Sequence, residues 1–134
     1  MPTLNPYLTF GGNCREAMNF YKEVLGGELS LMTVAESPFK GQMPEQFNDQ
    51  VLHSSLKTAT LELMATDMQP GKQVVGNDVH LCLLCKTEEE ANEFFDKLSA
   101  GGTVNQPLNK MFFGILGTLT DKFGKHWMVE CDLK

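Results

Sequence analysis

The sequence contains two similar stretches, NCREAMNFYKEVLGG (residues 13–27) and TEEEANEFFDKLSAGG (residues 87–102). Glu16-Ala17 in the first corresponds to Glu90-Ala91 in the second, an offset of 74 residues, and both stretches end in two glycines. In both, apolar residues recur at the spacing of one helix face. A final glycine suits the left-handed residue that often ends a helix. The repeat therefore predicts two equivalent amphipathic helices.

Each predicted helix begins with a candidate capping residue. Asn13 and Thr87 have side-chain oxygens that can accept a hydrogen bond from the first helical turn. Glu16 and Glu90 follow three residues later, which is the pattern of a capping box. We therefore expect Asn13 and Thr87 to cap their helices.

Short strand-like runs surround each helix. Those before the helices are residues 7–10 and 79–85, and those after them are residues 28–35, 50–57, 60–66, 103–106, 115–120 and 126–132. Each half reads strand, helix, three strands. This order predicts an α+β fold of two tandem βαβββ units. We expect residues 1–134 to form one domain, with unit one at 1–67, a linker at 68–77 that contains Pro70-Gly71, and unit two at 78–134.

The composition narrows the class of protein. The net charge is −6 and Arg15 is the only arginine, so the basic face that nucleic-acid binding requires is absent from the sequence. No apolar run is long enough for a membrane helix, and the N-terminus does not resemble a signal peptide. We expect a cytoplasmic protein with reduced cysteines. Cys82 and Cys85 are three residues apart in a predicted strand and should lie on opposite faces.

Three segments resemble a known family: NPYLTFGGNCREA (residues 5–17), LMATD (63–67) and GTLTDKFGKHW (117–127). They are similar to the PhnB-like branch of the vicinal oxygen chelate superfamily, the glyoxalase, bleomycin-resistance and dioxygenase proteins. The resemblance implies a mixed sheet curled around a cleft with the helices outside. It also implies a homodimer and a small-molecule ligand, and metal-dependent members hold a divalent ion.

The resemblance also implies where metal ligands would lie. The four family positions correspond here to Pro6, Glu62, His80 and Met128. Proline has no side-chain donor, and a thioether is a poor ligand for ions that prefer carboxylate or imidazole. His80 and Glu62 are therefore the candidate ligands of a degraded site, which could take Zn, Mn, Fe or Ni.

Strand alternation predicts which side chains face the cleft. It places Val51 and Ser55 there, and Trp127 on the helix side as part of the core. The expected ligand pocket consists of His53, Met64, Cys82, Phe113, His126 and Met128. Glu130 or His53 is the candidate catalytic base.

Three functions remain open at this point. The first is the binding of a small, mainly apolar molecule in the cleft, which suits the adaptable side chain of methionine. The second is a metal-dependent lyase or dioxygenase with a rearranged site, in which an ion on His80 and Glu62 polarises substrate oxygens. The third is a resistance protein that sequesters a drug.

Overall fold

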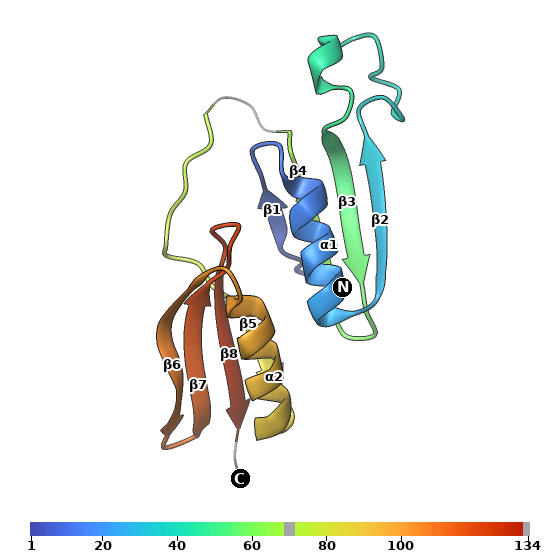
Figure 1. Ribbon diagram of the computed structural model, residues 1–134. Helices are drawn as coiled ribbons and strands as arrows, with labels where there is room; N and C mark the ends of the chain where they lie inside the picture. Colours follow the sequence, from blue (N-terminus) through green and yellow to red (C-terminus); the bar gives the residue numbers. More distant parts are fainter. Residues whose placement is uncertain (69–71, 133–134) are drawn as a thin grey trace. The chain divides into compact units, whose positions relative to one another are not determined.

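The computed structural model describes residues 1–68 and 72–132 (Figure 1). The chain divides into two compact units, Met1–Val74 and Val75–Lys134, which are called unit one and unit two from here on. Each unit has the order strand, helix, three strands and its own four-stranded mixed sheet, so the predicted α+β fold of two βαβββ units is confirmed. Pro70-Gly71 of the predicted linker lies outside the described residues. The single domain and the curl of the sheets around a cleft stay predictions.

Unit one contains β1 (Tyr7–Thr9), α1 (Cys14–Leu25), β2 (Glu28–Thr33), β3 (Val51–Lys57) and β4 (Glu62–Thr66). Its sheet has the order β1-β4-β3-β2. β1 and β4 are parallel, and the other neighbours are antiparallel. A short 3-10 helix, η1 (Glu45–Phe47), lies in the loop between β2 and β3.

Unit two contains β5 (Leu81–Cys85), α2 (Glu88–Ser99), β6 (Thr103–Met111), β7 (Gly114–Thr120) and β8 (His126–Asp132). Its sheet has the order β5-β8-β7-β6, with β5 and β8 parallel. The two sheets therefore share one topology, as the internal repeat predicts. Among the described residues, no helix is long and apolar enough to cross a membrane.

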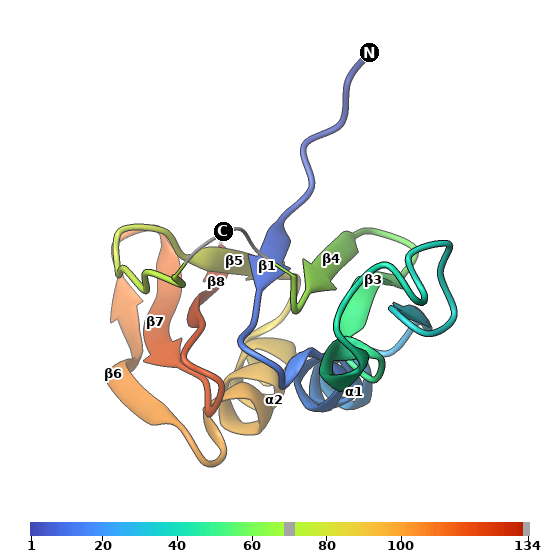
Figure 2. The ribbon, with the colours of Figure 1, turned by 90° about the horizontal axis from the view of Figure 1, so that it is seen from above.

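In each unit the helix packs on one face of its own sheet (Figure 2). The core lies between them and is formed by buried side chains of helix and strands: Ala17, Tyr21, Leu56, Leu63 and Ala65 in unit one, and Ala91, Leu98, Leu119, Trp127 and Val129 in unit two. Trp127 is thus a core residue, as predicted. The opposite face of each sheet carries alternate residues that are mostly exposed or half-buried, and we call it the open face.

Most predicted strand bounds agree with the structure within two residues, and three differences bear on the site. β6 extends to Met111 rather than residue 106, because an exposed edge strand needs no apolar alternation and tolerates Pro107. β5 begins at Leu81, so His80 precedes the strand. The prediction that Val51 faces the cleft is wrong, because a register shift between Met32 and Thr33 interrupts the alternation and Val51 is fully buried.

One of the two predicted caps is wrong. The Thr87 side chain accepts a hydrogen bond from the Glu90 N–H, as expected. Asn13 makes no side-chain cap. In its place, Oδ1 of the buried Asp67 accepts hydrogen bonds from the N–H groups of Gly12 and Cys14, at 2.9 and 3.0 Å. The cap of α1 therefore comes from the residue that follows β4, far away in the sequence.

The glycine pair after each helix has two separate roles. Gly26 and Gly101 both have a positive φ of 77°, which glycine adopts readily, but the ψ of −163° at Gly26 lies outside the left-handed helical conformation that the sequence predicts at a helix end. The second glycine approaches a neighbouring strand: a Cβ on Gly27 would overlap the carbonyl oxygen of Lys57, and a Cβ on Gly102 would overlap that of Thr120. The second glycine thus lets the chain enter the sheet closely beside the adjacent strand.

Candidate functional site

The strand register within each unit shows which open-face residue of unit one corresponds to which residue of unit two. Tyr7 lies opposite Met64 in unit one, and Cys82 lies opposite Met128 in unit two. Met64 and Met128 therefore occupy equivalent positions, although the family positions implied by the sequence resemblance pair Met128 with Glu62. The offset from Tyr7 to Cys82 is 75 residues, one more than between the helices.

Unit one has this extra residue between β1 and α1. It changes which residue of unit one corresponds to His80 of unit two. By register the counterpart of His80 is Asn5, because Tyr7 and Cys82 both lie on open faces. Pro6 is next to Tyr7, so strand alternation places it on the helix side of the sheet. The repeat offset measured on the helices therefore does not apply to the first strands.

The open face of unit one carries two polar pairs beside Met64. The Tyr7 hydroxyl lies 3.3 Å from Nδ1 of His53, and the two ring centroids are 6.0 Å apart. The Ser55 hydroxyl donates to Oε2 of Glu62 at 2.8 Å. Tyr7, Met64 and Ser55 are direct neighbours across β1, β4 and β3. An apolar thioether is thus flanked by hydrogen-bonding groups, of which the sequence predicts His53 and Glu62 but not Tyr7.

His126 on the open face of unit two uses both ring nitrogens. Its Nε2 lies 3.0 Å from the carbonyl oxygen of Gly76, which can only accept, so Nε2 carries the proton. Its Nδ1 then accepts from the Thr120 hydroxyl at 2.9 Å, and that hydroxyl accepts from the Asn105 amide. His126 therefore fixes the segment before β5 to the sheet. The His80 ring lies beside it, with centroids 5.5 Å apart.

The cysteines of β5 lie on opposite faces, as predicted. Cys82 is exposed on the open face, whereas Cys85 is buried and lies opposite Cys131. Burial raises the pKa of the Cys82 thiol, and the Glu130 carboxylate raises this pKa further. Burial also raises the pKa of Cys85, to about 11, with a further contribution from Glu90. Neither thiol is activated as a nucleophile at neutral pH.

The proximity of Glu130 and Cys82 predicts a change in thiol reactivity. Iodoacetamide should alkylate Cys82 before the three buried cysteines, at a rate that rises with pH above 8. Glu130→Gln removes a negative charge that disfavours the thiolate, so we expect it to raise the alkylation rate at pH 8 about twofold. Mass spectrometry of the peptide that contains Cys82 measures this rate. Asp96→Asn, at an exposed residue of α2, is the control. An unchanged rate in Glu130→Gln would contradict the effect of Glu130 on the Cys82 thiol.

The residues at the matched positions do not fit a metal ion well. They are Asn5 and Met64 in unit one, and His80 and Met128 in unit two. The two thioethers are unsuited to the ions that the family implies. Glu62 already accepts a hydrogen bond from Ser55. In the described part of the chain, no group of three or more His, Cys, Asp or Glu could hold a metal ion.

Phe113 and Met128, both predicted for the pocket, lie in unit two. Met128 is half-buried between Cys82 and Thr118. Phe113 is half-buried in the turn between β6 and β7, and its ring meets that of Phe112 edge-on at 5.1 Å. The six predicted pocket residues divide between the units: His53 and Met64 belong to unit one, and Cys82, Phe113, His126 and Met128 to unit two.

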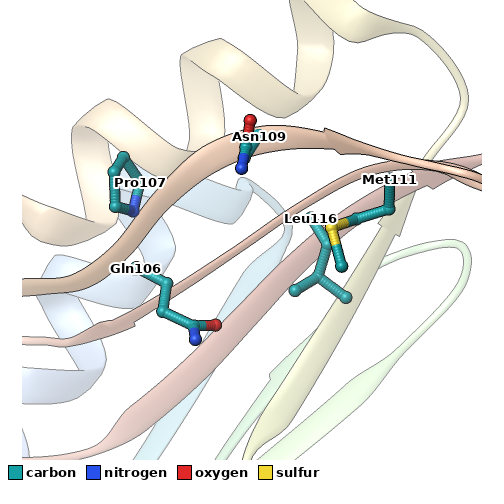
Figure 3. Close-up of a pocket in the computed structure, with 5 residues that line it drawn as sticks. All are labelled: Gln106, Pro107, Asn109, Met111 and Leu116. Carbon is teal, nitrogen blue, oxygen red and sulfur yellow. The ribbon is translucent and has the colours of Figure 1, made fainter.

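A hollow lies at the β6 edge of unit two (Figure 3). Its volume is about 270 Å³ and its lining residues are Gln106, Pro107, Asn109, Met111 and Leu116. In Figure 3 the side chains of Met111 and Leu116 point toward one another below β6. The sequence does not predict these residues as a site, because the expected strand ends at residue 106 and no motif marks them.

Comparison with known proteins gives consistent matches over the whole chain. Residues 3–129 match the model of the Glyoxalase/Bleomycin resistance protein/Dioxygenase superfamily. The chain is 32% identical over 137 residues to protein YjdN of Escherichia coli (strain K12), covering 95% of this chain and 93% of YjdN.

Two solved structures extend this similarity. Protein PA1353 from Pseudomonas aeruginosa has 34% identity and a TM-score of 0.90, with all of both chains covered. The PhnB protein from Bacillus cereus has 27% identity and a TM-score of 0.77, with coverage of 97% of this chain and 99% of that protein.

Proposed function

The chain belongs to the glyoxalase/bleomycin resistance protein/dioxygenase superfamily, and from this premise we propose that it binds a small, mainly apolar molecule on the open faces of its sheets. Similarity to YjdN and to the PhnB protein supports a place in the PhnB-like branch of this superfamily. We also predict that the protein is a homodimer, and light scattering of the purified protein would test this.

One observation carries the proposal: a methionine occupies the same register position on both open faces. Met64 lies between Tyr7 and Ser55, and Met128 lies between Cys82 and Thr118. Both methionines are half-buried, so their flexible thioethers are accessible to a ligand. Methionine packs well against apolar molecules of varied shape. The equivalent positions thus favour apolar binding over chelation.

The neighbouring polar groups would orient such a molecule. In unit one the imidazole of His53 and the hydroxyl of Tyr7 lie together, and the Glu62 carboxylate lies near the Ser55 hydroxyl. In unit two Glu130 is half-buried on the face that carries Met128. If the protein converts the ligand chemically, His53 and Glu130 are the groups that we propose for proton transfer.

Binding of the neutral dye Nile red would test the proposal. We expect a saturable rise in dye fluorescence with the intact protein. Met64→Glu and Met128→Glu place a charge at the two central positions, where contact with an apolar molecule would desolvate it at a cost. Each variant should weaken dye binding at least fivefold. The matched control is Leu4→Glu, at an exposed residue before β1, which should bind as wild type. Equal binding by all variants would overturn the proposal.

Metal analysis separates this function from metal-dependent chemistry. We expect tag-free protein dialysed against Zn, Mn, Fe or Ni, and then against buffer, to retain well under one ion per chain. His80→Ala should give the same result, because the counterpart of Met128 in unit one is Met64 and not a carboxylate. About one ion per chain, lost in His80→Ala or Glu62→Gln, would favour the lyase or dioxygenase instead.

A further inference from the structure

The edge strand β6 departs from a regular ladder at its centre. Its register with β7 shifts between Val104 and Gln106, and again between Gln106 and Asn109. Pro107 lies within the second shift and has no N–H to donate to a neighbouring strand. Register shifts of this kind bend a strand and redirect its side chains. β6 is therefore bent where it passes β7.

Gly117 shows the direction of this bend. A Cβ on Gly117 would lie 2.8 Å from the ring of Phe95, 2.9 Å from the Leu108 nitrogen and 3.0 Å from the Gln106 oxygen. Phe95 belongs to α2, so this is the helix side of the sheet. The main chain of β6 thus approaches the helix side at Gly117. It leaves space on the open side, above the adjacent Leu116.

The hollow of about 270 Å³ occupies this space (Figure 3). Leu116 is half-buried and Met111 is 47% exposed, and they supply apolar surface. Gln106 and Asn109 supply two side-chain amides, and in the described residues neither amide makes a hydrogen bond within the protein. None of the five lining residues is charged. Glu130, opposite Leu116 on β8, is the acidic neighbour of the hollow.

We propose that this hollow binds a small uncharged molecule that combines an apolar ring with a carboxamide group. The inference rests on the proposed function, because it names the ligand class for one part of the open face of unit two. A primary amide has both a donor and an acceptor, and can pair reciprocally with the side-chain amide of Gln106 or Asn109. The ring would contact Leu116 and Met111. An anion would lose hydration without a cationic partner in the lining, and Glu130 would repel it.

Three probes of one shape and different charge test this class: benzamide, benzoate and benzylamine. Each is titrated into the ¹⁵N-labelled full chain at millimolar concentration while the amide resonances are recorded. We expect benzamide to shift resonances of residues 106–111 and 114–117. We expect benzoate and benzylamine to bind at least tenfold more weakly. A preference for benzylamine would show that Glu130 determines binding and would overturn the ligand class.

Two variants test the position of the site. Leu116→Trp fills the hollow and should weaken benzamide binding at least tenfold. Its matched control is Leu84→Trp, at an exposed residue of β5 on the same open face, which should leave benzamide binding unchanged. Gln106→Leu removes one amide and should weaken benzamide at least threefold.

The outcomes also separate this inference from the proposed function. Benzamide shifts confined to residues around Cys82 and Met128, unaffected by Leu116→Trp, would overturn the inference and leave the proposed function standing. The absence of both benzamide shifts and Nile red binding would overturn both.

Discussion

Asp67→Ala is expected to lower the free energy of unfolding by about 3–5 kcal/mol, because it removes the acceptor of three backbone hydrogen bonds. Oδ1 of Asp67 accepts from Gly12 and Cys14, and Oδ2 accepts from Val51 at 3.0 Å. Asp67 is 8% exposed, so water would only partly replace its carboxylate as the hydrogen-bond acceptor. Without Asp67, the start of α1 and the start of β3 lose their common partner.

Urea unfolding followed by circular dichroism measures this effect. Asp67→Asn should be intermediate, because an amide oxygen can still accept from Gly12 and Cys14 while its NH₂ group faces the Val51 N–H. The control is Asp49→Ala, at an exposed residue, which should change stability by less than about 0.5 kcal/mol. A loss below about 1 kcal/mol in Asp67→Ala would show that Asp67 does not hold these segments together.

Gly27→Ala should be almost as costly, at about 3 kcal/mol or more. Gly27 has a φ of 91°, which an alanine adopts only with strain, and the added Cβ would overlap the carbonyl oxygen of Lys57 in β3. Relief of this overlap would pull β2 away from β3 at the first residue of their ladder, where Glu28 pairs with Lys57.

Its neighbour provides the matched control. Gly26 also has a positive φ, of 77°, but nothing lies within 4 Å of a Cβ built there. Gly26→Ala therefore incurs only the strain of a backbone with φ 77° and ψ −163°, about 1–3 kcal/mol, and should cost less than Gly27→Ala. Thermal and urea unfolding of both variants give the difference. Equal losses would mean that the second glycine is needed for its conformation alone and not for its close contact with β3.

Much of the fold follows from local patterns in the sequence. The repeated helices, the Thr87 cap and the order of strands depend on short-range spacing, and the structure confirms them. The cap of α1 could not be predicted, because Asp67 is distant in sequence and becomes the partner of Gly12 and Cys14 only when β4 pairs with β1. The full length of β6 could not be predicted either, since its residues are exposed and lack the alternation of a half-buried strand.

The candidate site was predicted less completely than the fold. Alternation places His53, Met64, Cys82 and Met128 on open faces, and the strand register agrees. The roles of His80 and Glu62 as metal ligands, and of Glu130 and His53 as bases, stay predictions. Alternation gave the wrong side for Val51, because a bulge changes the face of every residue beyond it.

By itself, the sequence determined two helix-and-sheet units and, within each regular strand, which side chains lie on the same face, because helical and strand periodicities are local properties of the chain. Only the tertiary structure decided which residues of the two units correspond. One additional residue between β1 and α1 makes Asn5 the counterpart of His80, and the four-residue connection between β3 and β4 makes Met64 the counterpart of Met128. A single residue reverses the face of a strand, and hydrogen bonding between strands far apart in the sequence determines that register.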